Sequence, residues 1–201
     1  MVFPLLLAAI PATIIVWLLG GRLAGIAQLR FRAYWWIVGG LAAEAVAIRS
    51  LDFPALPLIQ ARPALIIGSY ILILYGLWRN WRIPGMLVVC LGFGCNFLAI
   101  AANGGEMPIT YQALVNTGQT YLVNGPEPGQ QVAQSKDILL TPEQTRLLPL
   151  TDVLTTPWPP HKAASPGDFL TFTGILTVWV LAMRSRPAGK DTSAALTELA
   201  A

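Results

Sequence analysis

Charged and metal-binding residues are scarce in this chain of 201 residues. Only 11% of the residues are charged, against about 25% in an average soluble domain, whereas 55% are hydrophobic. This balance argues against a soluble domain, and a net charge of +3 gives no indication of nucleic-acid binding. The single histidine, His161, excludes a bis-histidine haem and every zinc site built from several histidines.

Cysteine and the common catalytic motifs are also scarce or absent. The two cysteines, Cys90 and Cys95, lie in an apolar run, where a helix would separate them by about 140° in direction and roughly 8 Å along the axis. A disulfide between them would therefore break the helix. The sequence has no Gly-rich phosphate loop, no G-x-S-x-G and no Cys-x-x-Cys. It implies no cofactor, indicates no catalytic residue, and makes an enzyme the less favoured interpretation.

Long apolar runs are what the chain does contain, and they predict an all-α membrane protein with a single integral membrane domain. Several runs fall short of the ~20 residues that cross a bilayer, so each is expected to include some flanking residues. The first run is followed by positive charge rather than preceded by it, which favours a retained span over a secretory signal peptide. The five predicted transmembrane helices cover approximately residues 3–19, 34–48, 64–78, 83–102 and 169–183.

The basic residues predict the orientation of these spans. With the N-terminus outside, the short outer loop holds only Arg49 and Arg62. Most tryptophans fall near the inner ends of the predicted spans, as in an aromatic belt at a membrane interface. The prediction is N-out and C-in, with a cytoplasmic tail at 184–201. The inner segments then receive Arg22, Arg30, Arg32, Arg79, Arg82, Arg184, Arg186 and Lys190.

A long extracytoplasmic loop, residues 103–167, separates the fourth span from the fifth. It has about 65 residues, and connections longer than ~15 residues are usually functional or disordered. Local signals predict a semi-ordered loop, with short helices at 108–115 and 141–148. A further helix-capping pattern runs from Ser165 to Asp168, where the fifth span begins.

Small residues on two spans predict close helix packing. The fourth span carries Gly85, Gly92 and Ala99 on one helical face, and the second span presents Gly39 and Gly40. Such residues let neighbouring backbones approach closely. We expect one of these two faces to contact a helix of the same chain and the other to contact a helix of another protein.

Polar residues inside the apolar runs predict a polar face in the bundle, formed by Asn96, Asn103, Glu44 and Tyr70. The two asparagines are interpreted as interhelical hydrogen-bonding groups rather than ligand-binding ones. Glu44 has two interpretations. Either its carboxylate reaches the outer interface, or it faces the bundle and accepts hydrogen bonds from Asn96 or Tyr70.

Three acidic residues in or beside the loop, Glu106, Asp152 and Asp168, have two interpretations. The favoured one is that they are solvated loop carboxylates, with Asp168 also capping a helix. The alternative is an outer-face acidic cluster that binds a cation through oxygen ligands. Nothing in their spacing requires the cluster.

The stretch Asn96–Pro108, with the pattern N-F-L-x-I-x-A-N-G-G-x-M-P, resembles a family of small bacterial multi-pass membrane proteins that is known only as a domain of unknown function. Similarity returns at 145–153 and at 165–168. The chain has Thr151 where the family pattern has glycine before the aspartate. The resemblance implies the same topology and a bacterial cytoplasmic (inner) membrane location. It brings no activity and no catalytic residue.

Three functions are consistent with this sequence. The first is an accessory subunit of a larger membrane complex, possibly of the respiratory or photosynthetic kind, with the lipid bilayer and other membrane subunits as partners. The second is a transporter or channel for a small solute, although no inverted repeat is present. The third is a membrane enzyme acting at the outer face, for which no nucleophile or base is evident.

Overall fold

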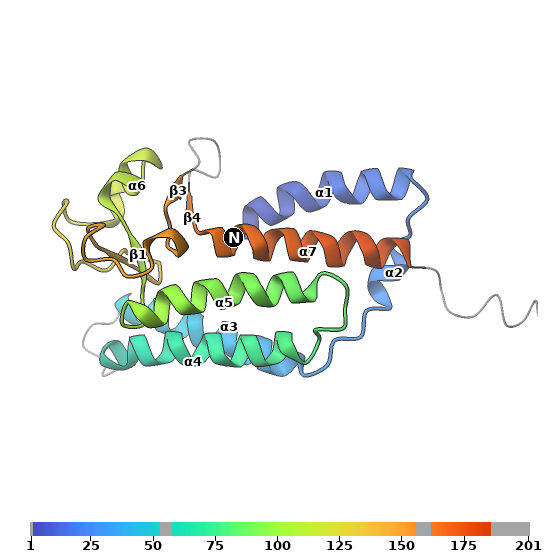
Figure 1. Cartoon of the computed structure of the whole chain (residues 1–201), viewed down its shortest axis with the longest axis horizontal. Helices are drawn as coiled ribbons and strands as arrows, with labels where there is room; N and C mark the ends of the chain where they lie inside the picture. The colour runs from blue at the N-terminus through green and yellow to red at the C-terminus, as the bar shows by residue number, and fades with distance from the viewer. Residues whose placement is uncertain (1, 53–57, 156–161, 186–201) are drawn as a thin grey trace, which may run out of the picture.

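Five long helices lie along the long axis of the molecule, and a small folded loop covers one end of them (Figure 1). The computed structural model describes residues 2–52, 58–155 and 162–185. His161 and the predicted tail after residue 185 lie outside the described residues. The long helices are α1 (Val2–Leu18), α3 (Tyr34–Arg49), α4 (Leu58–Trp78), α5 (Met86–Ala102) and α7 (Pro166–Arg184).

The helices alternate in direction along the chain. α1, α4 and α7 run away from the folded loop, whereas α3 and α5 run back toward it (Figure 1). The short helix α2 (Ala24–Ala27) lies beside the end of α7, and the 3-10 turn η1 (Ser50–Asp52) follows α3. Trp179 of α7 donates a hydrogen bond to the Thr13 hydroxyl of α1 at 2.8 Å, which joins these two helices.

The described residues between 103 and 165 form a folded loop, which we call the cap. Its strands β1 (Met107–Ile109) and β2 (Asp137–Leu139) pair in parallel, and β3 (Leu154–Thr155) pairs antiparallel with β4 (Ala163–Ala164). The helix α6 (Tyr111–Asn116) is capped by Thr110, and the 3-10 turns are η2 (Thr120–Leu122) and η3 (Leu148–Leu150). The cap has its own buried core, made of Ile109, Ala113, Leu114, Val132 and Leu139.

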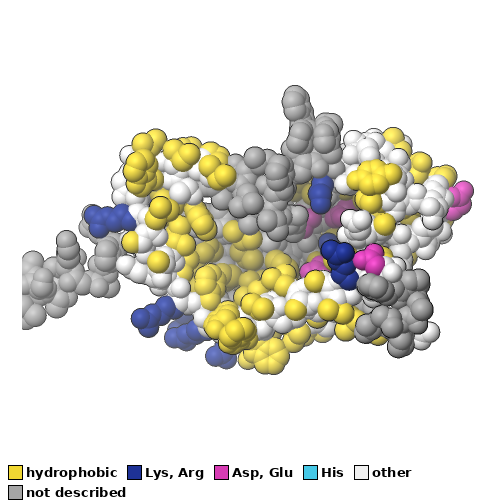
Figure 2. Space-filling view, turned by 180° about the vertical axis from the view of Figure 1, so that it is seen from behind, with side chains coloured by type: hydrophobic (Ala, Val, Ile, Leu, Met, Phe, Trp, Pro, Cys, Tyr) yellow, Lys and Arg dark blue, Asp and Glu magenta, His cyan; other side chains and the backbone are white. Residues whose placement is uncertain are grey.

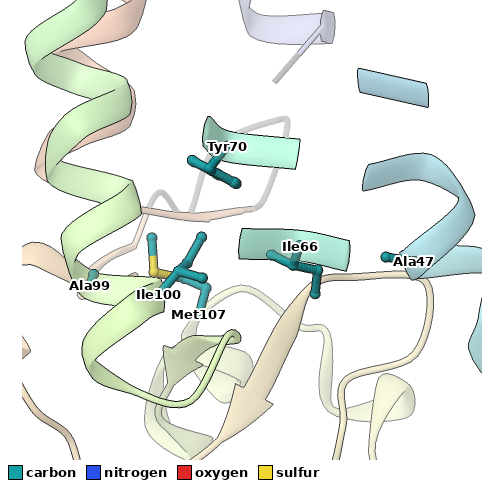
Figure 3. Packing of buried hydrophobic residues seen from close by; sticks show 6 residues of the cluster. All are labelled: Ala47, Ile66, Tyr70, Ala99, Ile100 and Met107. Carbon is teal, nitrogen blue, oxygen red and sulfur yellow. The ribbon is translucent and has the colours of Figure 1, made fainter. Parts of the chain in front are cut away.

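A second core joins the cap to the bundle. Met107 of β1 is fully buried and packs with apolar residues of α3, α4 and α5 (Figure 3). Burial of apolar surface contributes roughly 25 cal/mol per Å², so this contact helps to hold the cap against the helices. Its members are Ala47, Ile66, Tyr70, Ala99, Ile100 and Met107.

Glycines bring two pairs of helices into close contact. A Cβ added at Gly92 of α5 would lie 2.5 Å from the carbonyl oxygen of Gly167 in α7. A Cβ added at Gly40 of α3 would lie 2.7 Å from the carbonyl oxygen of Ser69 in α4. Both small-residue faces therefore contact helices of the same chain. These contacts do not require a foreign helix, and the expectation that one of the two faces meets one stays a prediction.

The other predicted packing residues divide between these contacts and open space. Gly85, with a φ of +90° just before α5, would place a Cβ 2.9 Å from the Gly174 carbonyl oxygen of α7. Ala99 is fully buried in the joint core of cap and bundle. Gly39 has no atom within 4 Å of an added Cβ, so it takes no part in the α3–α4 contact.

Two described helices are long and apolar enough to cross a membrane, Ile59–Trp78 and Pro166–Arg184. The apolar helix α5 is shorter, with 17 residues. Helices occupy all five predicted ranges, but α4 begins at Leu58 rather than at residue 64. Arg62 therefore lies inside α4 and not in an outer loop. A charge can be accommodated there because Arg62 forms an ion pair within the protein.

One predicted cap helix does not form. Residues 141–147 make turns, and only the short η3 follows at Leu148–Leu150. The Asn103 side chain forms two hydrogen bonds with the backbone of Arg146, accepting one from its N–H and donating one to its carbonyl, both at 2.8 Å. These backbone groups are then unavailable to a helix, and Leu147 has a φ of +53°.

Candidate functional site

A cavity of about 850 Å³ lies between α3 and α7, with α4 and α5 lining its other sides. Most of its walls are hydrophobic, and hydrophobic side chains also cover much of the bundle surface (Figure 2). Ligand-binding cavities in proteins typically have volumes of roughly 300–1,000 Å³. The apolar lining includes Leu41 and Ile48 of α3, Val89 and Phe93 of α5, and Phe172 and Ile175 of α7.

Polar side chains line the half of the cavity nearest the cap. Glu44 comes from α3, Tyr70 from α4 and Asn96 from α5. Thr171 comes from the beginning of α7, and Lys136 reaches the cavity from the cap, immediately before β2. The cavity is therefore amphipathic along its length, with a polar end under the cap and an apolar remainder.

Four of these groups, the side chains of Glu44, Tyr70, Lys136 and Thr171, have no hydrogen bond or ion pair with any residue that the structure describes. The Glu44 and Lys136 side chains are half-buried and carry opposite charges, and Tyr70 is only 3% exposed. The Tyr70 ring packs against Phe93 at a centroid distance of 5.8 Å. Glu44 thus faces the bundle, as one of its two interpretations proposed, but accepts no bond there from Asn96 or Tyr70.

Asn96 is held by the start of α7. Its amide nitrogen donates to Oδ1 of Asp168 at 2.9 Å, and its oxygen accepts from the Ser165 hydroxyl at 2.7 Å. Ser165 and Asp168 also form the capping box that begins α7. Asn103 bonds to backbone groups of Ala99 and, as described above, of Arg146. Both asparagines thus make contacts between segments of the chain.

A buried ion pair fixes the cap to α4. Arg62 is fully buried and pairs with Glu106, which is 5% exposed. Arg62 also donates to the Ser135 carbonyl at 2.8 Å, and Gln131 donates to the Glu106 carboxylate at 2.9 Å. Because Ser135 precedes Lys136, this pair also places the lysine over the cavity.

Acidic residues of the cap surround Lys136. The pKa of its ammonium is raised well above the ordinary value, chiefly by the Tyr70 phenol group and also by Asp137, Asp152 and Glu44, although burial opposes this. Burial, with help from Asp137 and Asp168, raises the pKa of Asp152 to about 8. Asp152 therefore holds its proton at neutral pH in the folded protein.

The three predicted acidic residues do not form one cation site. Glu106 pairs with Arg62, Asp168 bonds to Asn96 and Ser165, and Asp152 lies near Asp137. Within the described ranges, no group of three or more Asp, Glu, His or Cys side chains could hold a metal ion. Cys90 and Cys95 are free thiols.

The sequence did not identify Lys136 as a site residue, and it placed Arg62 in a loop. Lys136 lies in a long loop, where spacing says nothing about which helices it will meet. The buried position of Arg62 follows only from its pairing with Glu106, which lies beyond the next helix of the chain, after α5. No local pattern could have revealed either contact.

A family model described as "Family of unknown function (DUF5317)" matches residues 28–180. This range begins after α1 and includes α3, α4, α5, the cap, most of α7 and every polar residue of the cavity. No curated protein and no solved structure matches the chain.

Proposed function

We propose that this chain, which belongs to the DUF5317 family of unknown function, is a five-span membrane protein that binds a lipid-like amphiphile between α3 and α7. The observation that carries the proposal is the cavity. It is large, mostly apolar, and polar only where it meets the cap. An amphiphile has the same division between an apolar chain and a polar headgroup.

The alternating directions of the five helices support the membrane placement. α1, α3 and α5 have 16 or 17 residues, which corresponds to roughly 24–26 Å at 1.5 Å per residue, slightly less than the ~30 Å hydrocarbon core. Exposed tryptophans lie at the ends of the helices away from the cap. Basic side chains gather at the same end (Figure 2), as at a membrane interface. We place the cap outside the cell and the C-terminus inside.

Labelling of single cysteines tests the orientation. In a Cys90→Ser/Cys95→Ser background, an impermeant thiol reagent added to intact cells should label cysteines placed at 120–135. Cysteines at 186–195 should react only after the membrane is opened. The opposite pattern, or equal labelling of both sets, would contradict the N-out, C-in arrangement.

Blocking the cavity tests the ligand. Ala45 lines the cavity, whereas its neighbour Val46 does not line it and is 49% exposed. The protein should retain a bound amphiphile when it is purified in mild detergent and examined by native mass spectrometry. Ala45→Trp should lose most of it, and the matched control Val46→Trp should keep it. Equal retention by the two variants, or an empty wild-type protein, would reject the cavity as a binding site.

A role as an accessory subunit of a larger complex stays a prediction. The two glycine faces no longer support it, since both contact helices of the same chain at Gly40 and Gly92. The same purification, carried out at native expression level, tests it through the proteins that co-elute. A wild-type protein that is stable and alone would count against a subunit role and would leave amphiphile binding unaffected.

A further inference from the structure

Two opposite charges face the polar end of the cavity without a partner. Glu44 projects from α3 and Lys136 from the cap, and neither forms an ion pair within 4.0 Å in the part of the chain that is described. A charge held away from water is costly unless it is paired. Tyr70, which is 3% exposed, lines the same end, and its hydroxyl can donate one hydrogen bond.

The charges around this end decide between classes of headgroup. Asp137 and Asp168 add negative charge near Lys136 and Asp152, whereas Asp152 is protonated at neutral pH because its pKa is about 8. A headgroup with negative charge alone would meet more carboxylates than ammonium groups. An uncharged headgroup would leave Glu44 and Lys136 both unpaired. A headgroup with one charge of each sign can pair with both.

We infer that the cavity binds a zwitterionic phospholipid of the phosphoethanolamine class, with its phosphate at Lys136 and Tyr70, its ammonium at Glu44 and an acyl chain along α3 and α7. This inference rests on the proposed function and specifies its ligand. Lys136 donates to a phosphate oxygen, and the Tyr70 hydroxyl supplies a second donor. Glu44 accepts a hydrogen bond from the ammonium group. The acyl chain contacts the apolar side chains of Leu41, Phe172 and Ile175.

Competition between lipids tests the headgroup. The whole chain is reconstituted in nanodiscs that contain equal amounts of phosphatidylethanolamine, phosphatidylglycerol and diacylglycerol with the same acyl chains, and the retained lipid is identified by native mass spectrometry. The wild type should retain phosphatidylethanolamine about tenfold over phosphatidylglycerol, as expected for one charge-assisted hydrogen bond worth roughly 1.5 kcal/mol. Its preference over diacylglycerol should be larger, because diacylglycerol lacks both charged groups.

Two variants separate the contributions of the two charges. Glu44→Gln should shift retention toward phosphatidylglycerol, since the phosphate contact remains and the ammonium contact is lost. Lys136→Met should reduce retention of both phospholipids relative to diacylglycerol. Asp52→Asn is the matched control, because Asp52 is an exposed carboxylate near the same end that does not line the cavity, and its lipid profile should equal that of the wild type.

The outcomes separate this inference from the proposed function. A lipid-filled cavity with no headgroup preference, or a Glu44→Gln profile identical to the wild type, would overturn the zwitterion and leave amphiphile binding intact. A cavity that retains none of the three lipids would contradict both. Thermal unfolding in detergent verifies that each variant is folded. If Lys136→Met does not fold, the Glu44→Gln profile alone decides.

Discussion

The two ends of the helix bundle differ in how they accommodate polar groups. At the cap end, the Arg62–Glu106 pair, Asn96 and Asp152 are buried, and Lys136 and Glu44 face a cavity. At the opposite end, the arginines are exposed and the connections between helices are short. Arg82, for example, lies 5.4 Å from the ring centroid of the exposed Trp81. Charged side chains at the cap end therefore depend on specific partners, whereas charged side chains at the other end are exposed.

Two buried asparagines make the same comparison residue by residue. Asn80 and Asn96 are both 4% exposed. Asn80 bonds only to backbone atoms, namely the N–H and carbonyl of Arg32 and the carbonyl of Gly76, each at 2.7 Å, and so it fixes a turn. Asn96 bonds only to side chains and lines the cavity. An amide at one end stabilises a connection, and an amide at the other belongs to a candidate binding site.

The largest loss of stability should come from a substitution that forces α5 and α7 apart, since these helices run between the two ends of the bundle. Leucine at Gly92 would have to occupy space already filled by the Gly167 backbone and by Thr171. Gly92→Leu should lower the free energy of unfolding by about 5 kcal/mol or more. Gly94→Leu is the matched control, since nothing lies within 4 Å of a Cβ there. Thermal unfolding in detergent would show equal loss in both variants if the close contact were absent.

Removal of the buried carboxylate at the cap end should have the next largest effect. Glu106→Gln leaves the fully buried Arg62 without its counter-charge, which should cost about 3–5 kcal/mol of stability. The comparison is with Asp52→Asn, which breaks the exposed pair with Arg49 and should change stability by less than about 1 kcal/mol. Chemical denaturation measures both. Similar losses would mean that burial does not distinguish these ion pairs.

The last prediction is a change in the pH dependence of stability. The folded pKa of Asp152, about 8, lies above the ordinary value of 3.8, so the folded state holds a proton that the unfolded state releases. The resulting stability is complete below about pH 4 and is lost as the pH rises to about 8. Asp152→Asn cannot ionise, so it should be more stable than the wild type at pH 9, and the difference between the two should grow as the pH rises from 5 to 9. Parallel stability curves from pH 5 to pH 9 would refute this.

The sequence predicted the helices better than it predicted the cavity. Apolar runs and the Ser165–Asp168 capping pattern are local signals, and a helix stands at each of the five predicted ranges. The beginning of α4 was misplaced because Arg62 and Pro63 suggest a loop unless the partner of Arg62 is known. Lys136 was missed for the same reason, since its neighbours Glu44 and Tyr70 belong to distant helices. Pairings across the chain are set by tertiary structure and leave no periodic pattern.

The position of Arg62 inside α4 has a consequence for the assembly of the protein during synthesis. An arginine near the middle of a membrane helix costs roughly 2.5–3.5 kcal/mol on insertion, and less toward the end, as here. Its partner Glu106 is made roughly 40 residues later, which takes seconds at ~5–20 residues per second. Throughout that interval α4 is present without a counter-charge. In the membrane arrangement proposed above, the pair forms only after α5 is complete and the cap has crossed the membrane. In that arrangement, docking of the cap is the step that gives Arg62 its counter-charge and completes the insertion of α4.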